Sequence, residues 1–414
     1  MQETAHNTSH TWRVALVTET YPPEVNGVAA TFARVVEGLE GRGHALQLVR
    51  PRQGAEHRAR DEARFQEVLV PGLPIPRYPE LKMGLPARRE LLRRWTAQRP
   101  DVVHIVTEGP LGWSALRAAR QLGLPVVSDF RTNFHAYSRH YGVGWLQAPV
   151  MAYLRHFHNR TACTMVPTES LKNELAAAGL QGLRVVARGV DAQRFSPSHR
   201  SHALRASWGA DPGTCVAMCV GRLAPEKNLG TVLAAFEAMR EHEPRTRLVL
   251  VGDGPERRRL AQRCPEAHFA GARHGDDLAA HYASADVFLF PSTSETYGNV
   301  VPEAMASGLA VVACDHAAAG QLIRHGDNGL LVRCDDTSEF CRVARRIAGD
   351  WVQVREMGTA ARATAMQLDW SRIVDAIEKT YAAAIAVPEV AAGGGLGATP
   401  ASPPRWQPAR PTPP

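Results

Sequence analysis

Short apolar runs of four to six residues recur along the chain and alternate with stretches long enough to form helices. This alternation favours parallel β-sheets, because a parallel connection needs a crossover segment that is usually a helix. The runs form two series, and 414 residues exceed the size at which a single core usually stops growing. We therefore predict an α/β protein with two doubly wound, Rossmann-like domains that face each other across a cleft. The expected strands are 13–18, 45–49, 102–106, 125–129, 163–167 and 184–187, then 216–221, 247–252, 287–290, 310–314 and 330–333.

Interruptions of this pattern indicate the domain boundaries. Pro197, serines and charged residues separate the two series, and from Val387 onward the composition shifts to Ala, Gly and Pro. A segment of that composition buries too little apolar surface to become ordered. We expect a polar extension (1–12), a first domain (13–190), a linker (191–205), a second domain (206–370), a C-terminal helix (371–386) and a disordered tail (387–414).

The net charge of +7 is compatible with an anionic membrane surface or with nucleic acid. Basic residues are scattered except for a cluster at Arg88, Arg89, Arg93 and Arg94, and aromatic residues make up only 7% of the chain. No platform for stacking bases stands out. We expect no nucleic-acid partner, and nucleic-acid binding driven by charge alone is the weakest of the functional hypotheses.

Seven cysteines, an odd number, are dispersed along the chain, mostly in apolar contexts. They are typical of small buried side chains in a reducing compartment and not of a disulfide framework. The polar amino terminus is followed by an apolar run too short for a signal peptide. These features predict a cytoplasmic protein. The sequence leaves its oligomeric state open.

Two carboxylates stand eight positions apart: Glu295 follows the expected strand 287–290, and Glu303 lies in an early turn of an expected helix at 300–307. Gly298, between them, would let the backbone approach a ligand. A helix amino terminus favours phosphate, and carboxylates beside it can accept hydrogen bonds from hydroxyl groups. A nucleotide sugar offers hydroxyl groups on both sides of a diphosphate. The alternative is that Glu295 is a solvated loop residue and Glu303 an acid that complements the helix dipole.

Arg222 and Lys227 lie in one loop between the expected strand 216–221 and a helix that begins near Leu229. Doubly wound sheets bind ligands at the carboxyl ends of their strands. Two cations in such a loop would neutralise a departing diphosphate.

These motifs, in this order, resemble the retaining glycosyltransferases of family 4, which have the two-domain GT-B fold. The resemblance covers roughly residues 13–381 and is nearest to bacterial GDP-mannose-dependent α-mannosyltransferases that act on lipid or other glycan acceptors. It rests on Arg222-x4-Lys227, Val251-Gly-Asp-Gly-Pro255 and Glu295-x7-Glu303, and in the first half on Thr18-Glu-Thr-Tyr-Pro-Pro-Glu-Val-Asn-Gly27, Pro100-Asp-Val-Val-His-Ile105 and Glu108-Gly-Pro110.

The resemblance implies a role for each of several residues. Arg222 and Lys227 would stabilise the diphosphate, Glu303 would bind the ribose, and Glu295 would hold sugar hydroxyls near the reacting carbon. The backbone of 269–273, which is expected to follow a short strand, would read the nucleobase. The C-terminal helix would cross back onto the first domain. The expected donor-binding residues are Gly27, Gly271, Tyr297, Gly298, Asn299, Val300 and Glu303.

The segment 128–135 departs from the family's pattern. Arg131 stands where the family commonly has a histidine close to the donor sugar, and His135 follows four residues later. Either residue is a candidate for the catalytic contact: His135 could enter the cleft, or Arg131 could contact an acceptor phosphate or the developing charge. A surface or packing role for His135 is the alternative.

We expect no metal and no other cofactor, because two cations and a helix terminus can do the work of a divalent ion and no metal-ligand spacing is present. The acceptor would be a lipid or a glycan. The stretch 145–157 is amphipathic and could touch an anionic membrane, although such a helix more often packs on its own domain. Alternative hypotheses are a UDP-sugar-dependent glycolipid glycosyltransferase, a nucleotide-sugar epimerase, and a donor-binding protein that has lost transfer activity.

Overall fold

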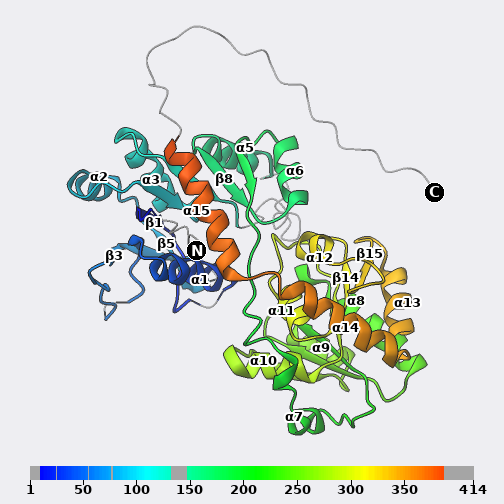
Figure 1. The fold of residues 1–414 in the computed structure, drawn as a ribbon. Helices are drawn as coiled ribbons and strands as arrows, with labels where there is room; N and C mark the ends of the chain where they lie inside the picture. The colour runs from blue at the N-terminus through cyan, green and yellow to red at the C-terminus, as the bar shows by residue number, and fades with distance from the viewer. Residues whose placement is uncertain (1–9, 25, 55, 76–77, 132–146, 387–414) are drawn as a thin grey trace, which may run out of the picture.

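The chain folds into two lobes, each built around a parallel sheet (Figure 1). A computed structural model describes residues 10–386 except 25, 55, 76–77 and 132–146. In this part of the chain the first sheet has the strand order β3-β2-β1-β6-β7-β8-β9 and the second has the order β12-β11-β10-β13-β14-β15. The chain proceeds outward from a central strand and then returns to that strand's other side. This doubly wound arrangement, the one expected, places a switch point between β1 and β6 and another between β10 and β13.

Helices cover both faces of the first sheet, which explains why its strands are continuous apolar runs. On β1, Val14 and Leu16 face the core shared with α1 and α15, whereas Ala15 and Val17 face α2 and α3. The strands are β1 (Arg13–Val17), β2 (Ala45–Pro51), β3 (Phe65–Val70), β6 (Val102–Ile105), β7 (Val126–Asp129), β8 (Cys163–Val166) and β9 (Leu183–Val185). The helices are α1 (Gly27–Gly41), α2 (Arg88–Ala97), α3 (Pro110–Gln121), α5 (Gln147–His158) and α6 (Glu169–Ala177).

The second sheet follows the same rule. Met218 of β10 faces the core of α10, α11 and α14, and its neighbours Ala217 and Cys219 face α8, α9 and α13. The strands are β10 (Val216–Val220), β11 (Arg247–Val251), β12 (His268–Gly271), β13 (Val287–Phe290), β14 (Ala310–Cys314) and β15 (Leu330–Val332). The helices are α7 (His202–Ser207), α8 (Leu229–His242), α9 (Arg257–Arg263), α10 (Gly275–Ser284), α11 (Val300–Ala306), α12 (Ala317–Leu322), α13 (Thr337–Ala348) and α14 (Trp351–Ala365), with short 3-10 turns at Pro197–His199 and Pro225–Lys227.

Four strands were not predicted from the sequence. The edge strand β3 was missed because Glu67 interrupts its apolar pattern; in the fold Glu67 is buried and accepts a hydrogen bond from Arg50 Nε at 2.6 Å. The antiparallel hairpin of β4 (Gly72–Ile75) and β5 (Tyr78–Gly84) was missed as well. The prediction that 269–273 follows a short strand was wrong, because His268–Gly271 itself forms β12.

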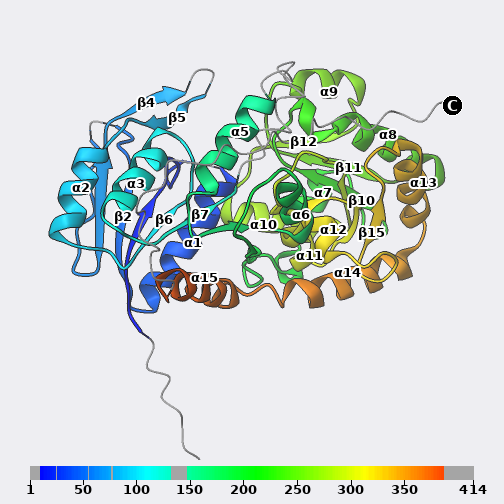
Figure 2. The ribbon, with the colours of Figure 1, turned by 90° about the horizontal axis from the view of Figure 1, so that it is seen from above.

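The last helix, α15 (Trp370–Ala386), runs from the second lobe to lie against α1 of the first (Figure 2). Its Val374, Ile377 and Tyr381 are buried in the core beneath β1. Gly38 of α1 permits the close approach, since an added Cβ would lie 2.5 Å from Val374 Cγ2. Residues of α15 therefore complete the core of the first lobe. The tail at 387–414 lies outside the described residues.

Candidate functional site

The candidate site lies at the carboxyl ends of β10 and β13 in the second lobe, beside α1 of the first lobe. Asn299, just before α11, donates a hydrogen bond from Nδ2 to Thr31 Oγ1 at 3.2 Å. The two halves of the protein are thus in direct contact beside the predicted donor segment.

Lys227 and Glu295, which the sequence placed in separate loops, form an ion pair through Nζ and Oε1. Ser292 Oγ donates a second hydrogen bond to the same carboxylate oxygen at 3.0 Å. Both members of the pair are largely buried, with side-chain exposures of 18% and 16%. Arg222 is exposed and lines one small hollow together with Lys227 and Phe290. The fold therefore gathers the three predicted groups at the carboxyl edge of the second sheet.

Glu303 lies in the first turn of α11, as predicted, and accepts a hydrogen bond from the buried Tyr282 hydroxyl at 3.0 Å. Burial raises the pKa of Glu303 to about 7, and the hydrogen bond from Tyr282 only partly opposes this rise. A carboxyl group so placed changes charge near neutral pH. It can accept hydrogen bonds from ligand hydroxyls once it is ionised.

The segment from Tyr297 to Val300 presents its backbone more than its side chains. Tyr297 is buried, and its hydroxyl donates to the carbonyl oxygen of Arg188 at 3.2 Å. Gly298 has φ +85°, which favours glycine, and an added Cβ would lie 3.3 Å from Glu295 Cγ. Val300 begins α11 and is partly buried. Any contact of Tyr297 with a ligand would have to come from its main chain.

Two further glycines were predicted to contact the donor. Gly27 is the first residue of α1, which Asn26 caps by accepting from Val28 N at 3.1 Å and Ala29 N at 2.9 Å. A Cβ added to Gly27 would meet only Asn299 Nδ2, at 3.7 Å. Gly271 ends β12 with φ +74°, and its carbonyl oxygen accepts from Gly252 N at 2.8 Å.

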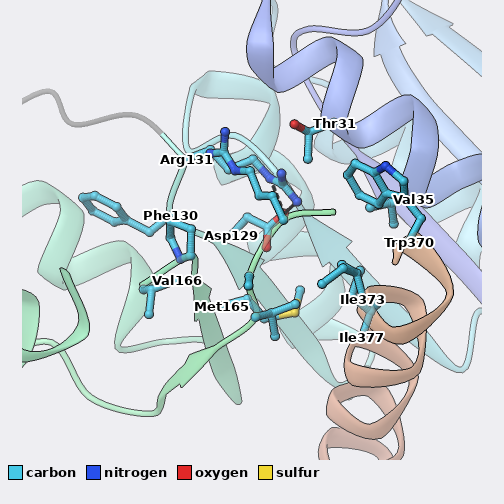
Figure 3. A pocket seen from close by; sticks show the side chains of 14 residues that line it. Thr31, Val35, Asp129, Phe130, Arg131, Met165, Val166, Trp370, Ile373 and Ile377 are labelled. Carbon is cyan, nitrogen blue, oxygen red and sulfur yellow. Dashed lines mark hydrogen bonds and ion pairs between the residues drawn. The ribbon is translucent and has the colours of Figure 1, made fainter. Parts of the chain in front are cut away.

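Arg131 is held by a buried carboxylate at the end of β7. Its Nε lies 2.6 Å from Asp129 Oδ2. Burial alone would raise the pKa of Asp129, but the charge of Arg131 and the contact with His104 hold it at about 2. Figure 3 shows Arg131 and Asp129 in the wall of a small cavity that also has Thr31 of α1 and Trp370 of α15 in its lining. His135, the other candidate, lies outside the described residues.

Arg188, which was not considered in the sequence analysis, follows β9 and is only 7% exposed. Its Nη1 donates to Asn299 Oδ1 at 3.2 Å, and its guanidinium lies over the ring of Tyr297, 5.4 Å from the centroid. Burial, together with the charge of Arg131, lowers the pKa of Arg188 to about 10. The only signal in the sequence was an arginine directly after an apolar run.

Two other predictions concern metals and membranes. Among the described residues no group of three or more His, Cys, Asp and Glu could hold a metal ion. In the same part of the chain no helix is long and apolar enough to span a bilayer. Helix α5, the amphipathic candidate, buries Leu154 and Phe157 in the first lobe and leaves Tyr153 43% exposed.

Each half of the chain matches a known protein family. The family described as "Glycosyltransferase Family 4" matches residues 25–194, and the family described as "Glycosyl transferases group 1" matches residues 214–350. The chain is 36% identical over 377 residues to a GDP-mannose-dependent alpha-mannosyltransferase of Mycobacterium tuberculosis, covering 90% of this chain and 96% of that protein. It is 33% identical to a protein of the same name from Corynebacterium glutamicum, covering 91% and 90%.

The crystal structure of Anabaena HepE in complex with UDP and glucose superimposes with a TM-score of 0.70 at 20% identity, covering 90% of this chain and 100% of that one. At such an identity the likeness shows the fold alone. Together with the relatives above, these matches confirm the fold and the enzyme class predicted from the motifs. The chain belongs to family 4 of the glycosyltransferases and has the GT-B fold.

Proposed function

We propose that this enzyme transfers mannose from GDP-mannose to a lipid or glycan acceptor with retention of the anomeric configuration. The observation that carries the proposal is the clustering of Arg222, Lys227 and Glu295 at the carboxyl edge of the second sheet, with Glu303 in the first turn of the helix that follows. The names of the mycobacterial and corynebacterial relatives support the choice of donor.

The charges of these groups suit a reaction in which a diphosphate departs. Arg222 and Lys227 stabilise the negative charge that grows as the glycosidic bond breaks. Glu295 holds hydroxyls of the transferred sugar, and in the free enzyme it forms the ion pair with Lys227. Donor binding therefore redistributes the contacts of Lys227 from one carboxylate to the incoming phosphates. Glu303 accepts hydrogen bonds from the ribose.

Backbone groups complete the donor site in this proposal. The main chain of Tyr297, Gly298 and Val300 borders the diphosphate, and Gly271 lies beside the nucleobase. Neither the φ of Gly27 nor the surrounding protein requires a glycine at this position. We therefore attribute the absence of a side chain to the ligand, which would occupy that space on the side of the first lobe. Two side-chain cations provide the electrophilic assistance, so we propose that no metal takes part. Full activity in excess EDTA would be the expected result, and loss restored by a divalent ion would contradict it.

We propose that the acceptor enters on the side of Arg131 and that either Arg131 or His135 contacts the donor sugar. Transfer takes place at the cytoplasmic face of an anionic membrane, with the exposed Tyr153 of α5 on the side toward the acceptor. Transfer to acceptors in anionic vesicles should exceed transfer in neutral vesicles. Equal rates would contradict the membrane contact without affecting the donor assignment.

The donor is tested by thermal stabilisation with GDP-mannose, GDP, UDP-glucose and UDP. A ligand that binds only the folded state stabilises it by about 2.7 kcal/mol at 100 times its Kd. We expect the guanine nucleotides to raise the melting temperature and the uracil nucleotides to have little effect. Stabilisation by UDP-sugars alone would favour the UDP-sugar-dependent glycolipid transferase instead.

The reaction itself is tested by NMR analysis of products. An α-linked mannoside formed from GDP-α-mannose would show transfer with retention. Conversion of the donor to another nucleotide sugar without an acceptor would indicate an epimerase. Binding without any turnover across a panel of lipid and glycan acceptors would indicate a protein that has lost transfer.

A further inference from the structure

Arg188 is a buried cation without a carboxylate partner among the residues that the structure describes. Its side-chain contacts there are the amide oxygen of Asn299 and the ring of Tyr297, and its backbone carbonyl accepts from the Tyr297 hydroxyl. Neutral groups of this kind do not cancel a positive charge. Burying an unpaired charge is costly, so such an arginine needs a reason.

The neighbouring charges leave that positive charge uncompensated. Arg131 and Asp129 form one ion pair, and Lys227 and Glu295 form another. Burial and the charge of Arg131 lower the pKa of Arg188, and the charges of Asp129 and Glu295 oppose that effect. Each of the two pairs is neutral as a whole, so neither pair compensates the charge of Arg188.

Arg188 also borders an internal space, which is too small for a ligand. Arg188 lines the same cavity as Arg131 and Asp129. Figure 3 shows that this cavity lies where α1 and α15 meet the ends of the first sheet's strands. The cavity has a volume of about 20 Å³ in the free protein, enough for a water molecule and no more. A larger ligand would therefore approach Arg188 from the cleft and not from within this cavity.

We propose that Arg188 is a third cationic contact for the donor, binding an oxygen of the nucleoside diphosphate. Its partners favour the donor over the acceptor, because Asn299 and Tyr297 belong to the segment that leads into α11. The planar guanidinium presents several N–H groups in a fixed fork that suits phosphate oxygens. This inference rests on the proposed function, since it requires a nucleoside diphosphate in the cleft.

The test compares GDP with guanosine on the full-length enzyme by calorimetric titration. Arg188→Met removes the charge and keeps an apolar stem, and Arg345→Met, an exposed arginine of α13, is the matched control. We expect Arg188→Met to raise the Kd for GDP by roughly 10-fold or more, because a charge-assisted hydrogen bond is lost. The Kd for guanosine should stay unchanged, and the control should bind both ligands as the wild type does.

A purely structural role for Arg188 predicts a different effect of Arg188→Met on both the melting temperature and ligand binding. If Arg188 only supports the fold, Arg188→Met should melt at a lower temperature and bind GDP and guanosine equally less well, or bind GDP as the wild type does; either result would overturn the inference. If Arg188 serves the ligand, the free variant should melt no lower than the wild type, since an uncompensated buried charge has been removed. Arg188→Lys keeps the charge and should recover part of the GDP affinity.

Two further outcomes are distinguishable. If the wild type binds no guanine or uracil nucleotide, the proposed function itself fails. If GDP binds the wild type and Arg188→Met equally, while transfer to an acidic acceptor is lost and transfer to a neutral one is kept, the oxyanion belongs to the acceptor and the donor assignment is wrong.

Discussion

Replacing Glu303 by glutamine should stabilise the protein at high pH and leave its stability unchanged at low pH. In the unfolded chain this carboxyl loses its proton near the ordinary value of 4.5, whereas in the fold it keeps the proton up to about pH 7. Between these values the folded state binds more protons, so the wild type loses free energy of unfolding as pH rises. One pKa unit corresponds to about 1.4 kcal/mol. Above pH 7 the ionised Glu303 should therefore lower the free energy of unfolding by about 3 kcal/mol.

Urea unfolding of the wild type and Glu303→Gln at pH 4.5, 6, 7 and 8 measures this difference directly. The advantage of the variant should grow from near zero at pH 4.5 and level off above pH 7. Glu241→Gln, an exposed glutamate near the end of α8, should show no such growth. A difference that is constant over this pH range would refute the reasoning, because it would mean that the carboxyl titrates alike in both states. The stabilised variant should bind GDP-mannose more weakly at pH 8, since the ribose loses a charged acceptor worth roughly 1.5–3 kcal/mol.

The other predictions concern charged groups on both sides of the cleft. Arg222→Met and Lys227→Met should lower kcat, on the order of 100-fold, more than they weaken donor binding, because charge on the diphosphate grows in the transition state; equal losses in steady-state rate and in titrated affinity would assign them to binding alone. Asp129→Asn should lower the free energy of unfolding at pH 7 by roughly 3–5 kcal/mol, because the largely buried Arg131 loses its carboxylate partner. The double variant with Arg131→Met should recover most of that loss in denaturation curves. Burial raises the pKa of Glu108 to about 8. The stability advantage of Glu108→Gln over the wild type should therefore grow between pH 5 and 8 in urea unfolding. A stability difference that does not change with pH would show that the Glu108 carboxyl is solvated.

Much of the fold follows from local apolar patterning. Every strand predicted from a continuous apolar run is present, because a parallel strand covered on both faces needs apolar side chains at successive positions. The edge strand β3 does not follow this rule, because its burial involves a polar group. The buried Glu67 of β3 accepts a hydrogen bond from Arg50, which lies 17 positions earlier on the neighbouring strand β2. A pairing of that kind has no local signature.

The site shows the same division. The sequence by itself determined the two doubly wound domains and which residues follow their strands, because apolar runs and loop chemistry are local properties. This was enough to expect Arg222, Lys227, Glu295 and Glu303 at the carboxyl edge of the second sheet. Only the tertiary structure decided which of them touch and how they ionise. The ion pair of Lys227 with Glu295 joins residues 68 positions apart, and the raised pKa of Glu303 comes from the side chains folded around it. The buried charge of Arg188 arises in the same way, because burial and the distances between charges depend on the packing of segments that are remote in sequence.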